Sequence, residues 1–549
     1  MPTVSAHVAL TLAQHIDAVF GVMGNGNAYF LDAIETHTDA TFTAVRHEQG
    51  AVVAADAHFR ASGRIAAGTS TYGAGFTNTL TALAESVQAH VPLVLVVGDE
   101  PTSGPRPWDV DQIALASAVG ARTYTVGRAD AAATTVIAIE HALTYRVPVV
   151  LAIPYDVAAL EAGEVPTAPS PRVPAPLAPR GEFAEGMLDE IATALAGAER
   201  PFLLAGRGAW LSGASTALGE LAAATGALTA SSALGRGVFP EAQYDLGVTG
   251  GFGADGAMEL IRTADVAVVF GASLNQFTMR FGELFAPGTK VFQVDITLAA
   301  THAHVGGFVR ADARVAAEAL VERLGATTTP NPWRESIDIA SARAYEDGDE
   351  LAPDGRLDPR SAARRIAELL PEDRIVVSDG GHFIGWANMY WPVAAPDRMM
   401  MIGTAFQSIG QGWPSVVGAA LARRESTVVL TSGDGGGLMA IADLESAVRA
   451  AGGRGMAVVW NDAAYGAEVN LYGLKGLAEG PMRIPEVDFA AFGAAVGAEG
   501  VVVRTLADLD RLATWTAEDP SSRRFLLLDL RISGDVIAPY QQEIIRVNS

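Results

Sequence analysis

The 549-residue sequence contains no cysteine, which excludes disulfides, zinc–thiolate sites, iron–sulfur clusters and a cysteine nucleophile. Long hydrophobic runs are also lacking. Apolar runs such as residues 91–98 and 525–528 have the length of strands and fall far short of the ~20 residues of a membrane span. Positive charge is scarce, because 38 Lys and Arg face 62 Asp and Glu, for a formal net charge of −24. This charge argues against nucleic acid or an anionic membrane as the main partner.

The N-terminal segment has no Lys or Arg before Arg46, so it lacks the basic region of a secretory signal, and we expect a cytoplasmic protein. Apolar residues, in contrast, are abundant. They make up 49% of the chain, whereas charged residues make up 18%. A chain with this composition can form packed cores, which excludes disorder as its main state.

Two proline-rich stretches, residues 161–181 and about 327–359, divide the chain into three blocks of ordinary domain size. Within each block, short apolar runs alternate with alanine-rich helical segments. This alternation is typical of parallel sheets flanked by helices. We therefore predict an α/β fold with three domains, each a mostly parallel sheet flanked by helices. The predicted domains span residues 1–165, 182–328 and 356–549.

The strongest functional signal lies in the third block, where a strand-like run ends in the glycine-rich segment 431–437. A glycine-rich turn from strand to helix exposes backbone N–H groups, which suits a diphosphate. Asp434 in this turn offers an oxygen ligand for Mg²⁺. A second strand-like run, 456–460, ends in Asn461-Asp462. Neighbouring parallel strands would bring these oxygens beside Asp434.

Other glycine-containing segments carry less weight. Gly206-Arg207-Gly208 follows the apolar run 202–205, as the start of a dinucleotide fingerprint would. The third glycine of that fingerprint is missing, so the segment does not predict nicotinamide binding. The sequence contains neither a Walker A motif nor a Gly-x-Ser-x-Gly elbow.

Gly433-Asp434-Gly435 followed by Asn461-Asp462 resembles the signature of thiamine diphosphate (ThDP) enzymes, in the group of acetohydroxyacid synthase, pyruvate decarboxylase and benzoylformate decarboxylase. The resemblance covers nearly the whole chain and is nearest to the acetolactate-synthase-like branch. It implies a pyrimidine-binding, a central and a diphosphate-binding domain, with ThDP and Mg²⁺ as cofactors. The implied diphosphate-binding residues are Gly433, Asp434, Gly435 and Gly436.

The implied Mg²⁺ ligands leave one alternative open. The family spacing from Asp434 to the second ligand lands on Asn461, whereas alignment through Tyr465, an implied cofactor-binding residue, lands on Asp462. We favour Asp462 as the side-chain ligand, with Asn461 as the alternative. The backbone carbonyl of Ala464 is then the third protein ligand.

The resemblance also assigns roles in the first block. The segment 45–51 matches Glu48 to the catalytic glutamate, which hydrogen-bonds N1′ of the aminopyrimidine and favours its 4′-imino tautomer. Gly73 and Asn78 belong to a turn that approaches the cofactor from the opposite side. Asn25 and Gln112 match positions on the substrate side, and we count them as catalytic candidates.

In the third block, the resemblance implies that the Gln407 carbonyl accepts from the 4′-amino group. The Ile409 N–H would donate to N3′, and its side chain would separate the two rings. Gly381 and His382 match a turn that reaches the diphosphate. Glu468 has the offset of the acid–base glutamate of pyruvate decarboxylases, with an exposed helix glutamate as the alternative.

These matches predict cleavage or formation of a C–C bond next to a carbonyl, foremost 2-oxo acid decarboxylation with carboligation. The alternatives are a 2-oxo acid decarboxylase or 2-hydroxy ketone lyase that releases an aldehyde, and a ThDP-binding protein without catalysis. The substrate is a small molecule, and the resemblance implies a homodimer or homotetramer with sites at the subunit interface. FAD stays open, because Asn275-Gln276 departs from the Asp-Asp-Arg of synthases that hold it.

Overall fold

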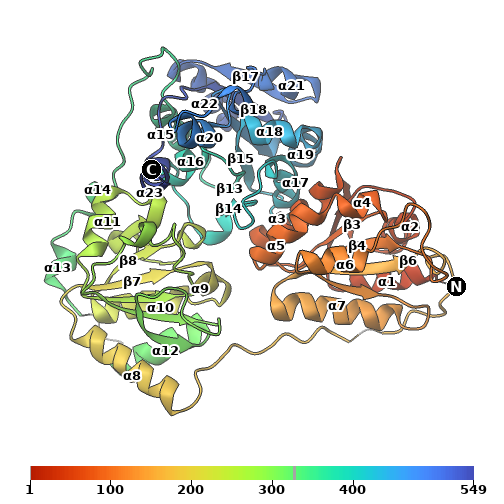
Figure 1. Ribbon diagram of the computed structural model, residues 1–549, viewed down its shortest axis with the longest axis horizontal. Helices are drawn as coiled ribbons and strands as arrows, with labels where there is room; N and C mark the ends of the chain where they lie inside the picture. The colour runs from red at the N-terminus through yellow and green to blue at the C-terminus, as the bar shows by residue number, and fades with distance from the viewer. Residues whose placement is uncertain (1, 168, 326–328, 549) are drawn as a thin grey trace.

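The computed structural model describes residues 2–167, 169–325 and 329–548. It contains three six-stranded sheets, one in each third of the chain (Figure 1), and every strand pair that we describe is parallel. The predicted α/β fold with three domains is therefore confirmed. The exact domain bounds stay a prediction, and residues 328 and 549, where the second and third predicted domains end, lie outside the described residues.

The N-terminal sheet has the strand order β2-β1-β3-β4-β6-β5, with hydrophobic clusters on both faces. The order reverses between β1 and β3. The carboxyl ends of these strands therefore form the switch point at which parallel α/β sheets bind ligands. The strands are β1 (Ala18–Gly21), β2 (Thr41–Ala44), β3 (Ala67–Ser70), β4 (Leu93–Asp99), β5 (Arg122–Thr125) and β6 (Pro148–Pro154). The helices are α1 (Val4–Leu12), α2 (Ala28–His37), α3 (Glu48–Ser62), α4 (Ala74–Thr77), α5 (Leu80–Gln88), α6 (Gln112–Ala118) and α7 (Ala131–Tyr145).

The central sheet has the order β12-β11-β10-β7-β8-β9, with its switch point between β7 and β10. This is the strand order of dinucleotide-binding folds. The strands are β7 (Pro201–Ala205), β8 (Leu228–Ser231), β9 (Asp245–Val248), β10 (Val266–Phe270), β11 (Lys290–Asp295) and β12 (Val305–Arg310). The helices are α8 (Glu182–Ala196), α9 (Arg207–Leu211), α10 (Ser215–Thr225), α11 (Asp255–Arg262), α12 (Ala313–Leu324), α13 (Pro332–Glu335) and α14 (Ile339–Ala342).

The third sheet, β14-β13-β15-β16-β18-β17, repeats the topology of the first, with its switch point between β13 and β15. The strands are β13 (Arg374–Ser378), β14 (Met399–Met401), β15 (Thr427–Gly433), β16 (Gly455–Asn461), β17 (Glu499–Val503) and β18 (Leu526–Arg531). The helices are α15 (Pro359–Leu369), α16 (Ile384–Tyr390), α17 (Gly412–Ala422), α18 (Asp434–Met439), α19 (Leu444–Ala451), α20 (Gly466–Glu468), α21 (Phe489–Ala495), α22 (Asp510–Ala517) and α23 (Pro539–Asn548).

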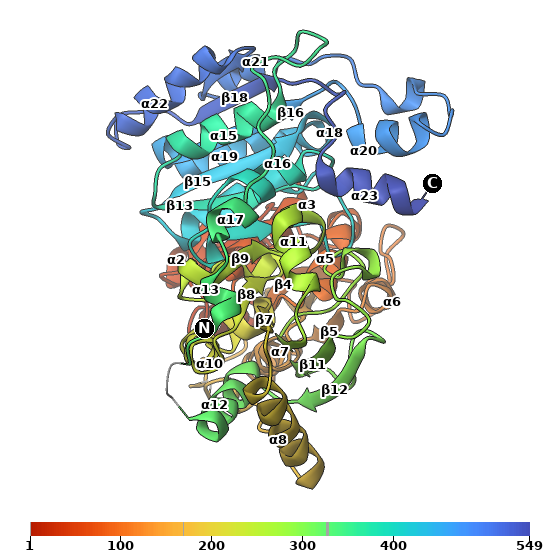
Figure 2. The ribbon, with the colours of Figure 1, turned by 90° about the vertical axis from the view of Figure 1, so that its left-hand side faces the viewer.

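The first and third domains share one hydrophobic core, because α3 packs on α17 between their sheets (Figure 2). The helices approach so closely that a Cβ atom on Gly418 would lie 1.9 Å from the Ala54 carbonyl oxygen. Only glycine permits this approach. The Arg46 N–H donates to Asp443 across the same contact at 2.7 Å. The two domains therefore form one packed unit.

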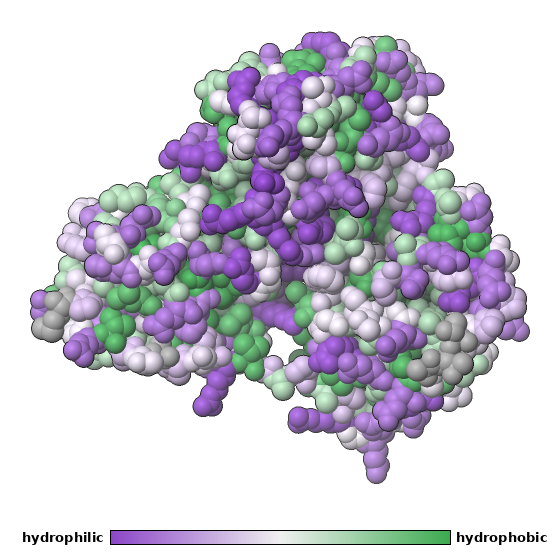
Figure 3. All heavy atoms as spheres, turned by 180° about the vertical axis from the view of Figure 1, so that it is seen from behind, coloured by the Kyte–Doolittle hydropathy of each residue, from purple (hydrophilic) through white to green (hydrophobic). Residues whose placement is uncertain are grey.

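The molecular surface mixes polar and apolar side chains over the three lobes, with a notch between the two lower lobes in Figure 3. Among the described residues, no helix is both long enough and apolar enough to cross a membrane.

Candidate active site

Two loops meet at the switch point of the N-terminal sheet. The loop after β1 is tied to the loop after β3, since the Gly26 N–H donates to Thr71 Oγ1 at 2.9 Å. Asn27 adds a buried hydrogen bond from its Nδ2 to Thr69 Oγ1, at 3.0 Å. Asn25, the substrate-side candidate, is exposed, and its Nδ2 donates to the Tyr72 hydroxyl at 3.0 Å. Asn25 is therefore held in place but remains accessible.

Glu48 is the first residue of α3, where the helix N-terminus favours a negative charge. Its Oε2 accepts a hydrogen bond from Asn78 Nδ2 at 2.9 Å. The fold thus joins two predicted site residues from different motifs. The Glu48 side chain is half-buried, whereas residues 51–55 behind it are fully packed in the core.

Gln112, the other substrate-side candidate, begins α6. It is buried, and its Oε1 accepts from the Gly73 N–H at 2.9 Å. Its Nε2 donates to the Gly98 carbonyl at 3.0 Å and to Asp99 at 3.1 Å. A buried amide must satisfy its donors and acceptors, and these three hydrogen bonds do so for Gln112. Gln112 thereby holds the Gly73 turn, whose φ of +60° favours glycine.

The diphosphate-binding candidates lie in the third domain, where β15 and β16 end side by side. Asp434 begins α18 and is buried, with its carboxylate accepting from the N–H groups of Gly435 and Ala464. Asp462 also accepts from the Ala464 N–H. Burial, together with repulsion from Asp462, raises the pKa of Asp434, and burial raises the pKa of Asp462 to about 6. The fold has therefore brought two carboxylates together around one backbone group.

Asn461, the alternative metal ligand, is fully buried and is anchored elsewhere. Its Nδ2 donates to Asp529 on β18 and to the Val487 carbonyl, both at 2.9 Å. Its Oδ1 has no hydrogen-bond partner among the described residues. The geometry favours Asp462, which shares a donor with Asp434, and leaves Asn461 as the alternative.

The loops that surround these carboxylates hold other candidates. Gln407 is exposed and has a φ of +59°, and Ile409 is half-buried. His382 is buried, and the loss of hydration lowers its pKa to about 4, so the imidazole is neutral at pH 7. Its Nε2 accepts from the Ala538 N–H at 3.3 Å. The neighbouring Gly381 carbonyl accepts from the Tyr540 hydroxyl at 3.2 Å.

Glu468 ends the short helix α20 and is exposed. The pKa of Tyr540 on α23 is raised, chiefly by burial and further by the negative charge of Glu468. This coupling places Glu468 beside the C-terminal helix. The position fits either alternative of the sequence analysis, an acid–base group or a surface glutamate.

The candidates thus form two half-sites. The first half-site lies in the N-terminal domain and includes Glu48. The second lies in the third domain and includes Asp434. Across the described residues, no hydrogen bond or ion pair connects a candidate of one half-site to a candidate of the other.

Comparisons with known proteins match all three domains. Residues 2–119 match the thiamine pyrophosphate enzyme N-terminal TPP-binding domain, residues 188–320 the central domain, and residues 379–529 the C-terminal TPP-binding domain. Together these matches span well over half of the chain. The chain belongs to the thiamine pyrophosphate enzyme family. Thiamine pyrophosphate is another name for ThDP, so the resemblance seen in the sequence is confirmed.

Relatives of known description are similar over most of their length. The chain is 28% identical over 457 residues to a probable acetolactate synthase large subunit of Methanocaldococcus jannaschii, covering 78% of this chain and 74% of the relative. It is 27% identical to a sulfoacetaldehyde acetyltransferase of Roseovarius nubinhibens, and the match covers 100% of this chain and 94% of that relative. An X-ray structure from Mycobacterium smegmatis, described as a thiamin diphosphate-dependent enzyme, superposes with a TM-score of 0.78 at 22% identity, covering 96% of this chain and 99% of that one.

The third-domain half-site of this ThDP-family chain fits a Mg²⁺–diphosphate group. A divalent cation would offset the repulsion between the carboxylates of Asp434 and Asp462. The glycine-rich segment packs closely on its neighbours, which side chains at these positions would prevent. A Cβ atom on Gly435 would lie 2.7 Å from the Tyr465 ring, and one on Gly436 would lie 2.8 Å from Asp379 Oδ2.

The sequence places Asp379 in the same strand-end turn as Gly381 and His382 but gives it no role of its own. This fully buried carboxylate follows β13 and accepts from the N–H groups of Gly380 at 2.8 Å, Gly410 at 3.0 Å and Gln411 at 3.2 Å. Ser432 Oγ, next to the glycine-rich loop, donates to it at 3.3 Å. Asp379 therefore clamps the turn after β13 and the loop at residues 410–411 to the end of β15. The signal in the sequence was its place in this turn, at a strand end before two glycines.

We expect Asp379→Asn to weaken ThDP binding about tenfold or more, because an amide nitrogen would face backbone donors and leave buried N–H groups unsatisfied. ThDP affinity by calorimetry is the measurement, and exposed Glu372→Gln is the matched control. Equal affinity of Asp379→Asn and the control would show that the clamp is not needed.

Proposed function

We propose that this chain is a ThDP- and Mg²⁺-dependent enzyme that makes or breaks a C–C bond next to the carbonyl of a small 2-oxo acid, foremost by decarboxylation with carboligation. The observation that carries the proposal is the position of Glu48 at the start of α3, held by Asn78 at 2.9 Å. A fixed carboxylate of this kind is what activation of the aminopyrimidine requires. The name of one relative, acetolactate synthase, supports carbon–carbon chemistry of this class.

Bound ThDP would supply an electron sink for the negative charge that develops on the substrate carbonyl carbon. The residues of the chain would position it and move protons. Glu48 would hold a proton at N1′ of the pyrimidine. Gln407 and Ile409 would bind the pyrimidine edge through their backbone, and Asn25 would face the substrate. Gln112, the other substrate-side candidate, would hold the Gly73 turn beside the cofactor.

Mg²⁺ would be held by Asp434, Asp462 and the backbone carbonyl of Ala464. The turn that presents Ala464 is sharp, because the preceding Ala463 has a φ of +59°. Asn461 is the alternative ligand, through its unpartnered Oδ1. Gly433, Gly435 and Gly436 would bind the diphosphate through backbone N–H groups, with His382, Gly381 and Tyr465 around them.

A second copy of this chain would complete each site, as a homodimer or within a homotetramer. The separation of the candidates into two half-sites supports this assembly, because pyrimidine and diphosphate must bind together.

FAD is not part of the proposal, although the central sheet has a dinucleotide-binding strand order. At its switch point the Gly208 N–H donates to the Gly271 carbonyl at 2.9 Å, so the two loops are in contact. Asn275 Oδ1 accepts from the Thr278 N–H at 2.8 Å and caps its own turn.

A second candidate function is release of an aldehyde by a 2-oxo acid decarboxylase or 2-hydroxy ketone lyase. The exposure of both Asn25 and Glu468 favours it, since Glu468 could give a proton to a substrate and Asn25 could hydrogen-bond to it. A ThDP-binding protein without catalysis is disfavoured, because Glu48, Asp434 and Asp462 are all in place.

The test is incubation of the protein, ThDP and Mg²⁺ with a panel of 2-oxo acids, with CO₂ and products followed by mass spectrometry. Acyloin or acetolactate-type products support the proposal, and aldehyde alone supports the second candidate. Hydrogen–deuterium exchange at C2 of bound ThDP that is no faster than in free ThDP would contradict both.

Glu468→Gln is expected to slow aldehyde release and raise the ratio of ligation product to aldehyde, because a carboxylic acid near the reacting carbon supplies a proton worth about 10²–10⁴-fold in rate. Both products are measured from one 2-oxo acid. Glu479→Gln, another exposed glutamate of the same domain, is the control. An unchanged ratio and rate would make Glu468 a surface residue.

A further inference from the structure

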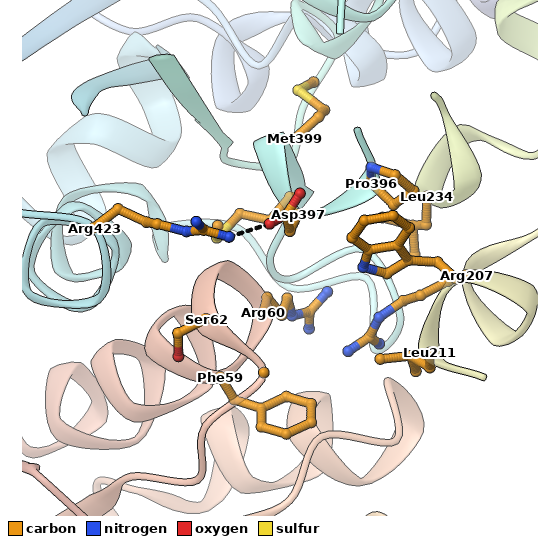
Figure 4. Close-up of a pocket in the computed structure, with 13 residues that line it drawn as sticks. Phe59, Arg60, Ser62, Arg207, Leu211, Leu234, Pro396, Asp397, Met399 and Arg423 are labelled. Carbon is orange, nitrogen blue, oxygen red and sulfur yellow. Dashed lines mark hydrogen bonds and ion pairs between the residues drawn. The ribbon is translucent and has the colours of Figure 1, made fainter. Parts of the chain in front are cut away.

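A cavity of about 240 Å³ lies where all three domains meet (Figure 4). The end of α3 contributes Arg60, the start of α9 contributes Arg207, and Arg423 follows α17. Trp210 and Leu234 of the central domain form apolar walls. The cavity lies outside both half-sites, because it contains none of their candidate residues. Three guanidinium groups, one from each domain, thus surround one space.

Two of the three cations have carboxylate partners. Arg60 is buried between Asp56, at 2.5 Å from its Nε, and Glu85, at 3.2 Å from its Nη2. Arg423 forms an ion pair with Asp397, which also lines the cavity. The positive charge of these two groups is therefore offset within the protein.

Arg207 has no such partner. Its Nη1 donates to the Ala89 carbonyl at 2.7 Å, and its Nη2 is buried with no hydrogen-bond partner among the described residues. Burial, followed by repulsion from Arg60, lowers the pKa of Arg207 to about 9. Figure 4 shows the side chains of Arg60 and Arg207 extending toward the middle of the cavity. A buried donor without an acceptor is costly, and a buried cation more so.

We propose that this cavity binds a phosphate-class oxyanion, held by Arg207 and bridging the three domains. A tetrahedral anion presents acceptor oxygens in several directions, so one ligand can accept from guanidinium groups that arrive from different elements. Its charge offsets that of Arg207, the one cation of the three without a carboxylate in the described structure. The source is either free phosphate or the phosphate group of a small metabolite, since the chemistry recognised is the same.

The experiment uses the full chain with saturating ThDP and Mg²⁺, so that the diphosphate site is filled before phosphate is added. Inorganic phosphate and glycerol 3-phosphate are titrated separately by calorimetry, and the melting temperature is followed in parallel. We expect binding of at least one anion, with a rise in melting temperature. Stronger binding of glycerol 3-phosphate than of phosphate identifies a phosphorylated metabolite as the source, and the reverse identifies free phosphate.

Arg207→Met should weaken this binding about tenfold or more, since a charge-assisted hydrogen bond of this kind is lost. Arg262→Met removes the same charge from an exposed site of the same domain and should change nothing. Without anion, Arg207→Met should be at least as stable as the parent, because an unpartnered buried charge is removed. Arg207→Lys keeps the positive charge but loses the planar guanidinium group, so it should bind the anion more weakly than the parent. This variant tests the proposal even if Arg207→Met does not fold.

The proposal is overturned if neither anion binds the loaded parent, or if Arg207→Met and Arg207→Lys bind as tightly as the parent does. Loss of activity in the 2-oxo acid panel with normal anion binding would contradict the proposed function and leave this site intact.

Discussion

Replacement of Glu48 by glutamine should lower turnover roughly 10²–10⁴-fold and leave the fold and ThDP affinity unchanged. The carboxylate lies at the start of α3, and Asn78 Nδ2 donates to its Oε2 at 2.9 Å. Glutamine has nearly the same shape and can keep a hydrogen bond to Asn78. It cannot take up or share the proton at N1′ of the pyrimidine, so only the chemistry should fail.

Turnover of a 2-oxo acid and hydrogen–deuterium exchange at C2 of bound ThDP are the two measurements, and both should fall together. Glu35→Gln, an exposed glutamate on α2, is the matched control for loss of one carboxylate in the same domain. A Glu48→Gln protein that turns over within tenfold of the parent would show that Glu48 is not the activating group.

The second large effect is expected at Asp434. Asp434→Ala should weaken ThDP and Mg²⁺ together by about a hundredfold or more, because the charge of cation and diphosphate would no longer be balanced in a buried site. The structure also explains why the affinities for ThDP and for Mg²⁺ should both fall when Asp434 is replaced. Asp434 lies at the start of α18 beside the glycine-rich loop, and it shares the Ala464 N–H with Asp462.

Calorimetric titration of each cofactor in the presence of the other measures the effect. Asp434→Asn keeps the shape of the side chain and removes its charge. It should match the alanine variant in affinity, while the cofactor-free protein stays at least as stable as the parent, since a buried charge is removed. Asp510→Ala, at an exposed position in the same domain, is the control. Unchanged affinity for ThDP and Mg²⁺ would remove Asp434 from the site.

Much of the architecture was predictable because its signals are local. Apolar runs at 427–430 and 456–460 lie within β15 and β16, since a strand buried on both faces is apolar along its whole length. The polar residues that follow such runs lie at the carboxyl edge of the sheet, because all the strands are parallel. The convergence of Asp434 and Asp462 follows from these two facts.

The contacts of each side chain were not predictable, because they depend on residues far away in the chain. The sequence does not reveal that the Gln112 amide binds Gly73, on the loop after β3, and Gly98, near the end of β4. Asp379 belongs to a turn that the sequence matches, but its role as a clamp exists only because the loop at Gly410 and the end of β15 at Ser432 reach it.

The sequence by itself determined the three α/β domains, the family and the strand ends at which the candidate residues lie, because periodicity and short motifs are properties of neighbouring residues. Only the tertiary structure decided which groups are satisfied and which are not. It joined α3 to α17 in one core, pointed Gln112 inward, and buried Arg207 Nη2 with no hydrogen-bond partner among the described residues. Burial and pairing arise when distant segments pack together, and the cost of an unpaired charge appears only once water has been excluded from around it.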